Sequence, residues 1–219
     1  MNKHALVICG CIVLVLAGVA EAQPHSDIGD LYLEFGMNKF DIDGEFDDSL
    51  VLTTSSQLVN VPEVLETSGY SIAVGRAWNQ GGLSFFYLFG NPETRSVLGD
   101  SDGRYHLYGM DVYGLPFTKK NNNNKISPLV RGSISLVSLG IDDSATDGMS
   151  VVPATFRGFA AAIGIGALVQ LGSNFHFTAE VDRRWMSFNT VEGVGDPLDM
   201  EESMTLTTDF LRVGLSIYQ

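Results

Sequence analysis

The sequence predicts an all-β fold, an eight-stranded antiparallel up-and-down β-barrel that crosses a membrane. Three observations support this prediction: eight segments alternate apolar and polar residues with period two, their connections alternate between long and short, and several strands have one apolar face opposite a face of small and charged residues. The expected strands span residues 30–40, 68–78, 83–90, 104–116, 128–140, 158–171, 175–186 and 205–218.

The chain begins with the pattern of a cleaved secretory signal. Lys3 precedes an apolar run from Ala5 to Val19, and the small residues Ala20 and Ala22 follow the run. We therefore expect residues 1–22 to be removed and residues 23–219 to form one barrel domain. A membrane-anchoring helix is the alternative, but it needs about twenty apolar residues, more than this run contains.

Composition narrows the possible functions. Both cysteines, Cys9 and Cys11, lie in the segment expected to be removed, so we expect no disulfide and no cysteine metal site in the mature chain. The sequence has no Gly-rich phosphate loop and no His/carboxylate cluster with metal spacing, so we expect no cofactor. The formal net charge of -13 argues against nucleic-acid binding, because phosphates select basic surfaces. No apolar segment after Ala22 is long enough for a spanning helix, whereas glycine and aromatic residues are abundant, which indicates a β-rich chain.

The connections predict the orientation of the barrel. Residues 41–67, 91–103, 141–157 and 187–204 form long connections, 79–82 and 172–174 form tight turns, and 117–127 is intermediate. Long loops at one end and short turns at the other are typical of outer-membrane barrels, and they place both chain ends in the periplasm. The long loops also hold much of the acid, which would face outward from the cell: Asp41, Asp43, Glu45, Asp47, Asp48, Glu63, Glu66, Glu192, Asp196, Asp199, Glu201 and Glu202.

Alternation alone does not tell which face of a strand is outside, because a soluble barrel turns its apolar face inward. Two features favour an apolar exterior here. Small residues and opposite charges on one face suit a narrow interior, where charges must compensate one another. Trp78 and Trp185 end strands of opposite direction in phase with the apolar face, as expected for an aromatic girdle at each membrane interface.

Charged residues on the opposite face form the main candidate site. The first and last strands are neighbours in a closed barrel, so Glu34 is expected to meet Arg212. We predict an ion-pair network that plugs the lumen, since eight strands leave an interior just filled by side chains; a gated polar pathway is the alternative. The residues predicted to form the network are Glu34, Asp111, Arg131, Glu180, Asp182, Arg184 and Arg212.

The run FAAAIGIGALVQLGSNFHFTAEVDRRW, with the closing segment LRVGLSIYQ, resembles the OmpA-like and opacity-type family of small outer-membrane β-barrels. The resemblance extends from about Leu31 to the C-terminus. It implies a monomer that contacts outer-membrane lipid and lipopolysaccharide and is folded by the barrel-assembly machinery. Members of this family usually end in an aromatic residue, and here Gln219 follows Tyr218, which puts the efficiency of assembly in question.

Two further hypotheses concern the surface. Outward-facing Arg183 is expected either to pair with Asp209 or to contact lipopolysaccharide phosphates, for which a guanidinium is well shaped; an interfacial charge that snorkels is the simpler alternative. Two loops contain Asp-x-Asp-Gly, whose hard oxygen ligands suit calcium, but both lack the full EF-hand spacing. The calcium candidates are Asp41, Asp43, Asp100 and Asp102.

Two other functions stay open. A soluble lipocalin-like carrier would need an apolar cavity and a charged exterior. A lipid A-modifying enzyme would need a nucleophile with a histidine base within reach, but none of the three histidines after the signal, His25, His106 and His176, forms a His-x-Ser pair. The expected function is therefore a non-enzymatic barrel with a structural or surface-interaction role.

Overall fold

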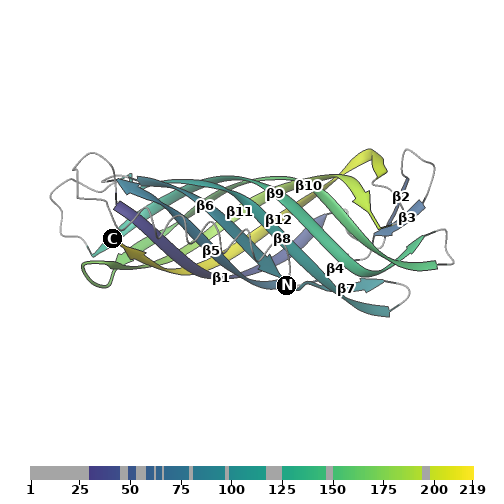
Figure 1. Cartoon of the computed structure of the whole chain (residues 1–219), viewed down its shortest axis with the longest axis horizontal. Coiled ribbons are helices and arrows are strands. Elements are labelled where there is room, and N and C mark those ends of the chain that lie inside the picture. The colour runs from purple at the N-terminus through teal and green to yellow at the C-terminus, as the bar shows by residue number, and fades with distance from the viewer. Residues whose placement is uncertain are drawn as a thin grey trace.

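The computed structural model describes residues 30–44, 49–52, 58–61, 63–65, 67–78, 81–96, 99–116, 125–146, 150–193 and 198–219. Within them, the long strands of the barrel are β1 (Asp30–Gly44), β5 (Thr67–Trp78), β6 (Gly81–Gly90), β8 (Gly99–Gly114), β9 (Ile126–Thr146), β10 (Ser150–Gln170), β11 (Phe175–Glu192) and β12 (Leu198–Tyr218). Four short strands gather at one end of the barrel, namely β2 (Ser49–Leu52), β3 (Leu58–Val61), β4 (Glu63–Val64) and β7 (Glu93–Ser96) (Figure 1). No helix among the described residues is long and apolar enough to cross a membrane.

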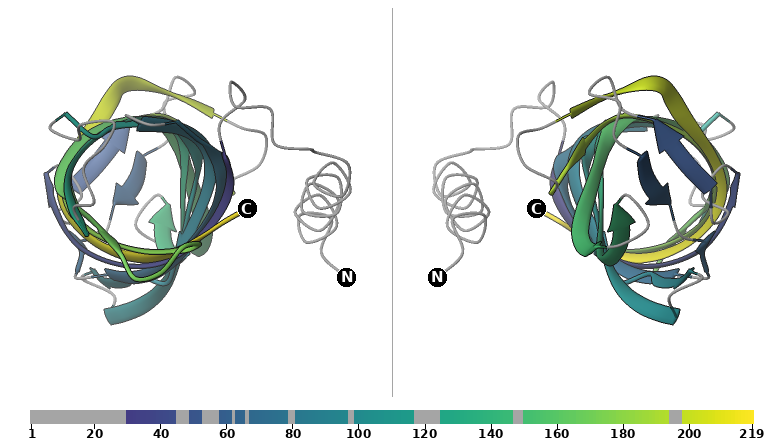
Figure 2. Two further views of the ribbon diagram at one scale, coloured as in Figure 1. Left: turned by 90° about the vertical axis from the view of Figure 1, so that its left-hand side faces the viewer. Right: turned by 90° about the vertical axis from the view of Figure 1, so that its right-hand side faces the viewer.

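The sheet closes on itself. Each long strand pairs antiparallel with its neighbours, and β1 pairs with β12, so the end-on views show a ring (Figure 2). Following the register once around the ring from Asp41 leads back to Leu31 of the same strand, a stagger of ten residues (41 to 31). Strand number and stagger together fix the tilt of the strands. The predicted all-β, eight-stranded antiparallel barrel is confirmed.

All eight predicted strands are present, but several are longer than predicted. We call the end of the barrel with the β5–β6 and β10–β11 connections the turn end, and the opposite end the loop end. Toward the loop end, β9 continues to Thr146 and β10 begins at Ser150, so most of the long loop predicted for 141–157 is paired strand. β12 likewise begins at Leu198.

The strands are longer than predicted because their apolar residues move from the outward to the inward face part-way along, which we call the change of face. In β9, the apolar residues up to Leu136, which is 54% exposed, occupy the outward positions. From Val137, which is 2% exposed, the apolar residues occupy the inward positions instead, as Leu139 does. The same change of face occurs between the neighbouring residues Leu107 and Tyr108, Trp185 and Met186, and Phe210 and Leu211. The prediction assumed that the apolar residues of a strand stay on one face along its whole length. It therefore ended each strand where the apolar residues move to the other face.

The barrel therefore has two zones. Toward the turn end, large apolar side chains point outward; this apolar belt includes Phe35, Phe85, Val112, Ile134, Ile163, Ile165, Val181, Leu211 and Leu215. Toward the loop end, apolar side chains fill the interior; this loop-end core includes Leu107, Val137, Leu139, Ile141, Phe156, Phe188, Met204 and Leu206. The loop-end zone thus has the polarity of a soluble barrel, and the belt has the reverse.

The four aspartates proposed for calcium lie in strands, so their prediction as loop residues was wrong. Asp41 and Asp43 belong to β1 and pair with β12, and Asp100 and Asp102 belong to β8 and pair with β7. In the described part of the chain, no group of three or more His, Cys, Asp or Glu side chains is placed to hold a metal ion. The signal segment 1–22 and several other predicted residues lie outside the described residues: His25, Glu45, Asp47, Asp48, Glu66 and Asp196.

Candidate functional site

Carboxylates from three strands meet around Arg131 of β9 in the barrel interior. Its NH1 nitrogen lies 2.9 Å from Asp111 Oδ2 of β8, and its Nε lies 2.8 Å from Glu180 Oε2 of β11. Its NH2 nitrogen lies 3.6 Å from Glu34 Oε2 of β1. Arg131 is only 5% exposed, so these contacts are removed from water.

Arg212 of β12 binds the same three carboxylates. Its NH2 donates to Glu34, and its NH1 lies 3.3 Å from Asp111 Oδ2 and 3.4 Å from Glu180 Oε1. The Ser216 hydroxyl donates to Glu34 Oε2 at 3.2 Å. The predicted contact between Glu34 and Arg212 is thus present. Two guanidinium groups bridge three carboxylates in what we call the central ion cluster: Glu34, Asp111, Arg131, Glu180 and Arg212.

Asp182 and Arg184 form a second ion pair beside this cluster, toward the loop end. Arg184 NH2 lies 3.4 Å from Asp182 Oδ1. The Arg184 guanidinium also lies 4.3 Å from the ring centroid of Phe210 and 5.9 Å from that of Phe86, distances at which cation–π attraction operates. The structure therefore buries all seven charged residues that the sequence placed inside, and five of them form one connected cluster.

Three interior tyrosines lie on the turn-end side of the cluster; the alternation of the last strand had placed Tyr218 on the inward face, but Tyr32 and Tyr113 were not predicted there. The hydroxyls of Tyr113 and Tyr218 lie 3.3 Å apart, and Tyr32 stacks on Tyr218 with ring centroids 5.3 Å apart. The Arg131 guanidinium lies 5.7 Å from the Tyr113 ring centroid, which joins this tyrosine layer to the cluster. The alternation of strand faces could have revealed Tyr32, because it precedes Glu34 by two residues and therefore lies on the same inward face.

The predicted surface residues lie on the outer wall. Trp78 lies at the turn end of β5 and Trp185 lies at the change of face in β11, and each is 48% exposed. Arg183 Nε lies 3.3 Å from Asp209 Oδ1, and both side chains are more than half exposed. An exposed pair of this kind contributes little to stability.

Aromatic rings also gather on the outer wall over β6 and β8. Tyr87 stacks on Tyr108 with centroids 4.9 Å apart, and its hydroxyl lies 2.8 Å from His106 Nδ1. Ser138 of β9 lies directly opposite His106 in the register. A search for His-x-Ser along the sequence cannot find this serine, because it comes from the neighbouring strand.

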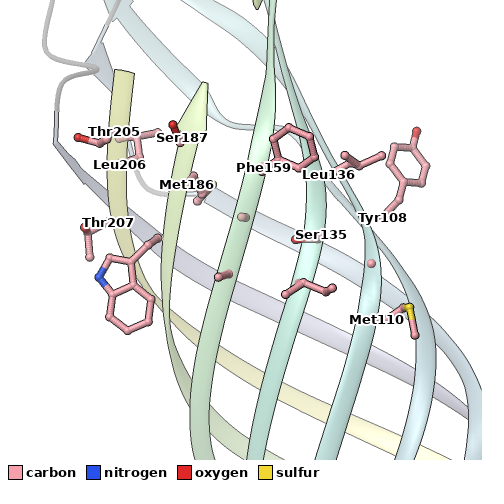
Figure 3. Close-up of a pocket in the computed structure, with 15 residues that line it drawn as sticks. Tyr108, Met110, Ser135, Leu136, Phe159, Met186, Ser187, Thr205, Leu206 and Thr207 are labelled. Atoms are coloured by element: carbon pink, nitrogen blue, oxygen red, sulfur yellow. The ribbon is translucent and has the colours of Figure 1, made fainter. Parts of the chain in front are cut away.

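A groove crosses the outer wall at the level where the apolar residues change face, with a volume of about 770 Å³ (Figure 3). Ala161 of β10 lies at its middle, between its register neighbours Trp185 of β11 and Ile134 of β9. A small side chain between two large ones leaves the depression. The other outward-facing residues that line the groove are Tyr108, Met110, Leu136, Phe159, Ser187, Thr205 and Thr207.

Comparison with known proteins identifies the fold. No protein-family model and no curated protein matches the sequence. Among solved structures, neisserial surface protein A is similar with a TM-score of 0.57 and 10% identity, over 86% of this chain and 97% of that chain. The outer membrane protein OprG from Pseudomonas aeruginosa has a TM-score of 0.53 and 12% identity, over 88% of this chain and 96% of that chain. This chain has the fold of the small outer-membrane barrels. The small-barrel fold confirms the resemblance indicated by the sequence but does not assign an activity, because one fold supports many functions.

Proposed function

We propose that the mature chain is an integral outer-membrane protein, a non-enzymatic barrel that presents its loop end at the cell surface. The observation that carries this proposal is that the belt has apolar side chains outside and charged side chains inside. Ile165 is 68% exposed and Ile163 56%, while Glu180 and Arg212 are almost completely buried. A continuous apolar surface of this extent is unfavourable in water, whereas lipid accommodates it, and a closed barrel leaves no unpaired strand edge in the bilayer.

The change of face supports the proposed orientation, with the loop end outside the cell. Beyond it, the outward positions of β9 are Ser138, Gly140 and Asp142, while the interior becomes apolar. This zone suits water outside the cell, and the turn end would then face the periplasm. Export by the signal segment 1–22, folding by the barrel-assembly machinery, a monomeric state and contact with lipopolysaccharide complete the proposal.

The interior contents support a closed lumen. From the turn end, the tyrosine layer, the central ion cluster and the loop-end core follow one another along the axis, and all are largely buried. Eight strands enclose an interior that side chains can fill. We expect the purified barrel to show no steady single-channel current in a planar bilayer, and repeated current steps would reject the closed lumen.

A soluble lipocalin-like carrier fits the molecule less well. Such a carrier would need an apolar cavity inside and charges outside along its whole length. The belt shows the reverse, with Arg131 inside and Phe159 outside at 62% exposure.

A lipid-modifying enzyme is the second candidate, favoured by the pairing of His106 with Ser138 next to an apolar groove. A histidine and a serine side by side can act as base and nucleophile. However, His106 Nδ1 contacts the hydroxyl of Tyr87, which belongs to β6, on the side of His106 opposite to Ser138 of β9. Release of fatty acid from lipid A that is lost in both His106→Ala and Ser138→Ala would establish the enzyme; no release by the wild-type protein would exclude it.

Cell fractionation followed by gel electrophoresis tests the main proposal. We expect the protein to sediment with outer membranes, and its unboiled, detergent-solubilised form to migrate differently from the boiled form, because a closed barrel resists unfolding by detergent. A soluble protein with no mobility difference would reject the membrane location and favour the carrier.

A further inference from the structure

The groove over Ala161 lies across the boundary between the apolar belt and the loop-end zone (Figure 3). Ile134, Leu136 and Phe159 make its apolar part, and the hydroxyl groups of Ser187 and Thr205 lie at its β11–β12 side. Its volume of about 770 Å³ is within the range of sites that bind small molecules. Such a groove suits an amphiphile with its apolar part toward the turn end.

A polar row borders the groove on the loop-end side. Ser138 pairs with His106 on one side and with Arg157 on the other. Each of the three lies two residues toward the loop end from a residue that lines the groove, so it shares the outward face of that residue. The row therefore stands directly above the apolar part of the groove.

Two guanidinium groups flank the groove, Arg157 on its loop-end side and Arg183 on its turn-end side. Arg157 is 56% exposed and binds Glu192 through NH2 at 2.6 Å, and Arg183 contacts Asp209 through Nε. Neither contact uses all the nitrogens of its guanidinium, and the planar fork is well suited to a phosphate. Thr155 of β10 continues the outer wall above Arg157, and Asn189 of β11 lies beside Arg157 at the β10–β11 bulge; the polar groups of both suit sugar hydroxyls.

We propose that this groove holds an acyl chain of lipopolysaccharide, with a phosphate of its headgroup bound by Arg157. The inference rests on the proposed membrane location. Arg157 and the polar wall beside it favour a phosphorylated glycolipid over a phospholipid, whose headgroup has no sugars to place on that wall.

The fluorescence of Trp185 can report the occupant directly, because Trp185 lines the groove and the chain has only one other tryptophan, Trp78. Trp78→Phe leaves Trp185 as the single fluorophore. In vesicles of phospholipid with brominated acyl chains, the bromine atoms quench Trp185. Unbrominated lipopolysaccharide that enters the groove should displace them and restore the fluorescence.

Three further changes in the Trp78→Phe protein test the site. Ala161→Leu fills the groove, and we expect it to raise the lipopolysaccharide concentration for half-recovery roughly tenfold, because losing the burial of two methylene groups has about this effect. Ala167→Leu is the matched control on the same strand outside the groove and should change nothing. Arg157→Gln should bind phosphorylated and dephosphorylated lipopolysaccharide equally, whereas the parent protein should prefer the phosphorylated form.

The outcomes separate the two proposals. Equal recovery in Ala161→Leu and Ala167→Leu, or no preference of the parent protein for the phosphorylated lipid, would overturn the groove as a lipopolysaccharide site and leave the membrane location intact. A heat-modifiable barrel whose fluorescence does not respond to lipopolysaccharide would do the same. Absence of both quenching and the mobility difference would overturn the membrane location, and this inference with it.

Discussion

Arg131→Met tests the central ion cluster most directly, because it removes a guanidinium and keeps an unbranched side chain. The wild-type cluster has two guanidiniums for three carboxylates, with Arg131 at 2.8 Å from Glu180 and 2.9 Å from Asp111. The variant leaves Arg212 to serve all three. Breaking one buried ion pair costs about 3 to 5 kcal/mol, most of it from the charge left without a partner. We expect a loss of this size in the free energy of unfolding.

Urea titration of the barrel refolded in lipid vesicles, followed by tryptophan fluorescence, measures this loss. Arg183→Met is the matched control, because it removes the same group from an ion pair whose side chains are 59% and 63% exposed. That change should cost at most about 1 kcal/mol. An equal, small cost for both variants would show that water already solvates the interior, and the closed lumen would be rejected.

The double variant Arg131→Met with Glu180→Gln separates the loss of contacts from the stranding of charge. Glu180→Gln removes one carboxylate that Arg131 no longer balances. We therefore expect the double variant to be more stable than Arg131→Met alone. A double variant whose destabilisation equals the sum of the two single changes would contradict coupling within the cluster.

Three other predictions use the same unfolding assay. Ile165→Lys in the apolar belt should lower the free energy of unfolding by about 2 to 4 kcal/mol, and Ser138→Lys beyond the belt should lower it by less than about 1 kcal/mol. Equal losses would contradict the proposal that the membrane surrounds the belt and not the loop-end zone. Phe156→Ala in the loop-end core should cost about 3 to 5 kcal/mol, and a cost near zero would contradict close packing there. Gly158→Ala should cost about 1 to 3 kcal/mol because its Cβ would collide with the Ser187 carbonyl oxygen, and a neutral effect would show that the β10–β11 bulge can relax.

The sequence predicted the number of strands, their order and the residues that point into the barrel. It could do so because a strand alternates its faces strictly, so Glu180, Asp182 and Arg184 had to share one face whatever the partners were. Closure added one long-range contact, since the first and last strands must meet, and this was enough to pair Glu34 with Arg212.

The contacts across strands could not be predicted in the same way. Whether Ser138 lies opposite His106 depends on the register between β8 and β9, and the alternation within each strand does not specify that register. The groove over Ala161 depends on neighbours from two other strands for the same reason. The extension of the strands toward the loop end was missed because it requires a change of face, as between Trp185 and Met186, which a fixed alternation treats as the end of a strand.

The two zones are stabilised by different forces. In the loop-end zone, water outside favours burial of side chains such as Phe156 and Leu139, as in a soluble protein. In the proposed membrane location, lipid outside the belt is as apolar as the wall, so the hydrophobic effect contributes little there, and paired charges and backbone hydrogen bonds must hold the strands. The loop-end core thereby keeps β9, β10 and β12 paired beyond the belt, where β7 pairs with β8 and β3 pairs with β9. In the proposed surface role, an extension held by paired strands would lose little conformational freedom on binding a partner.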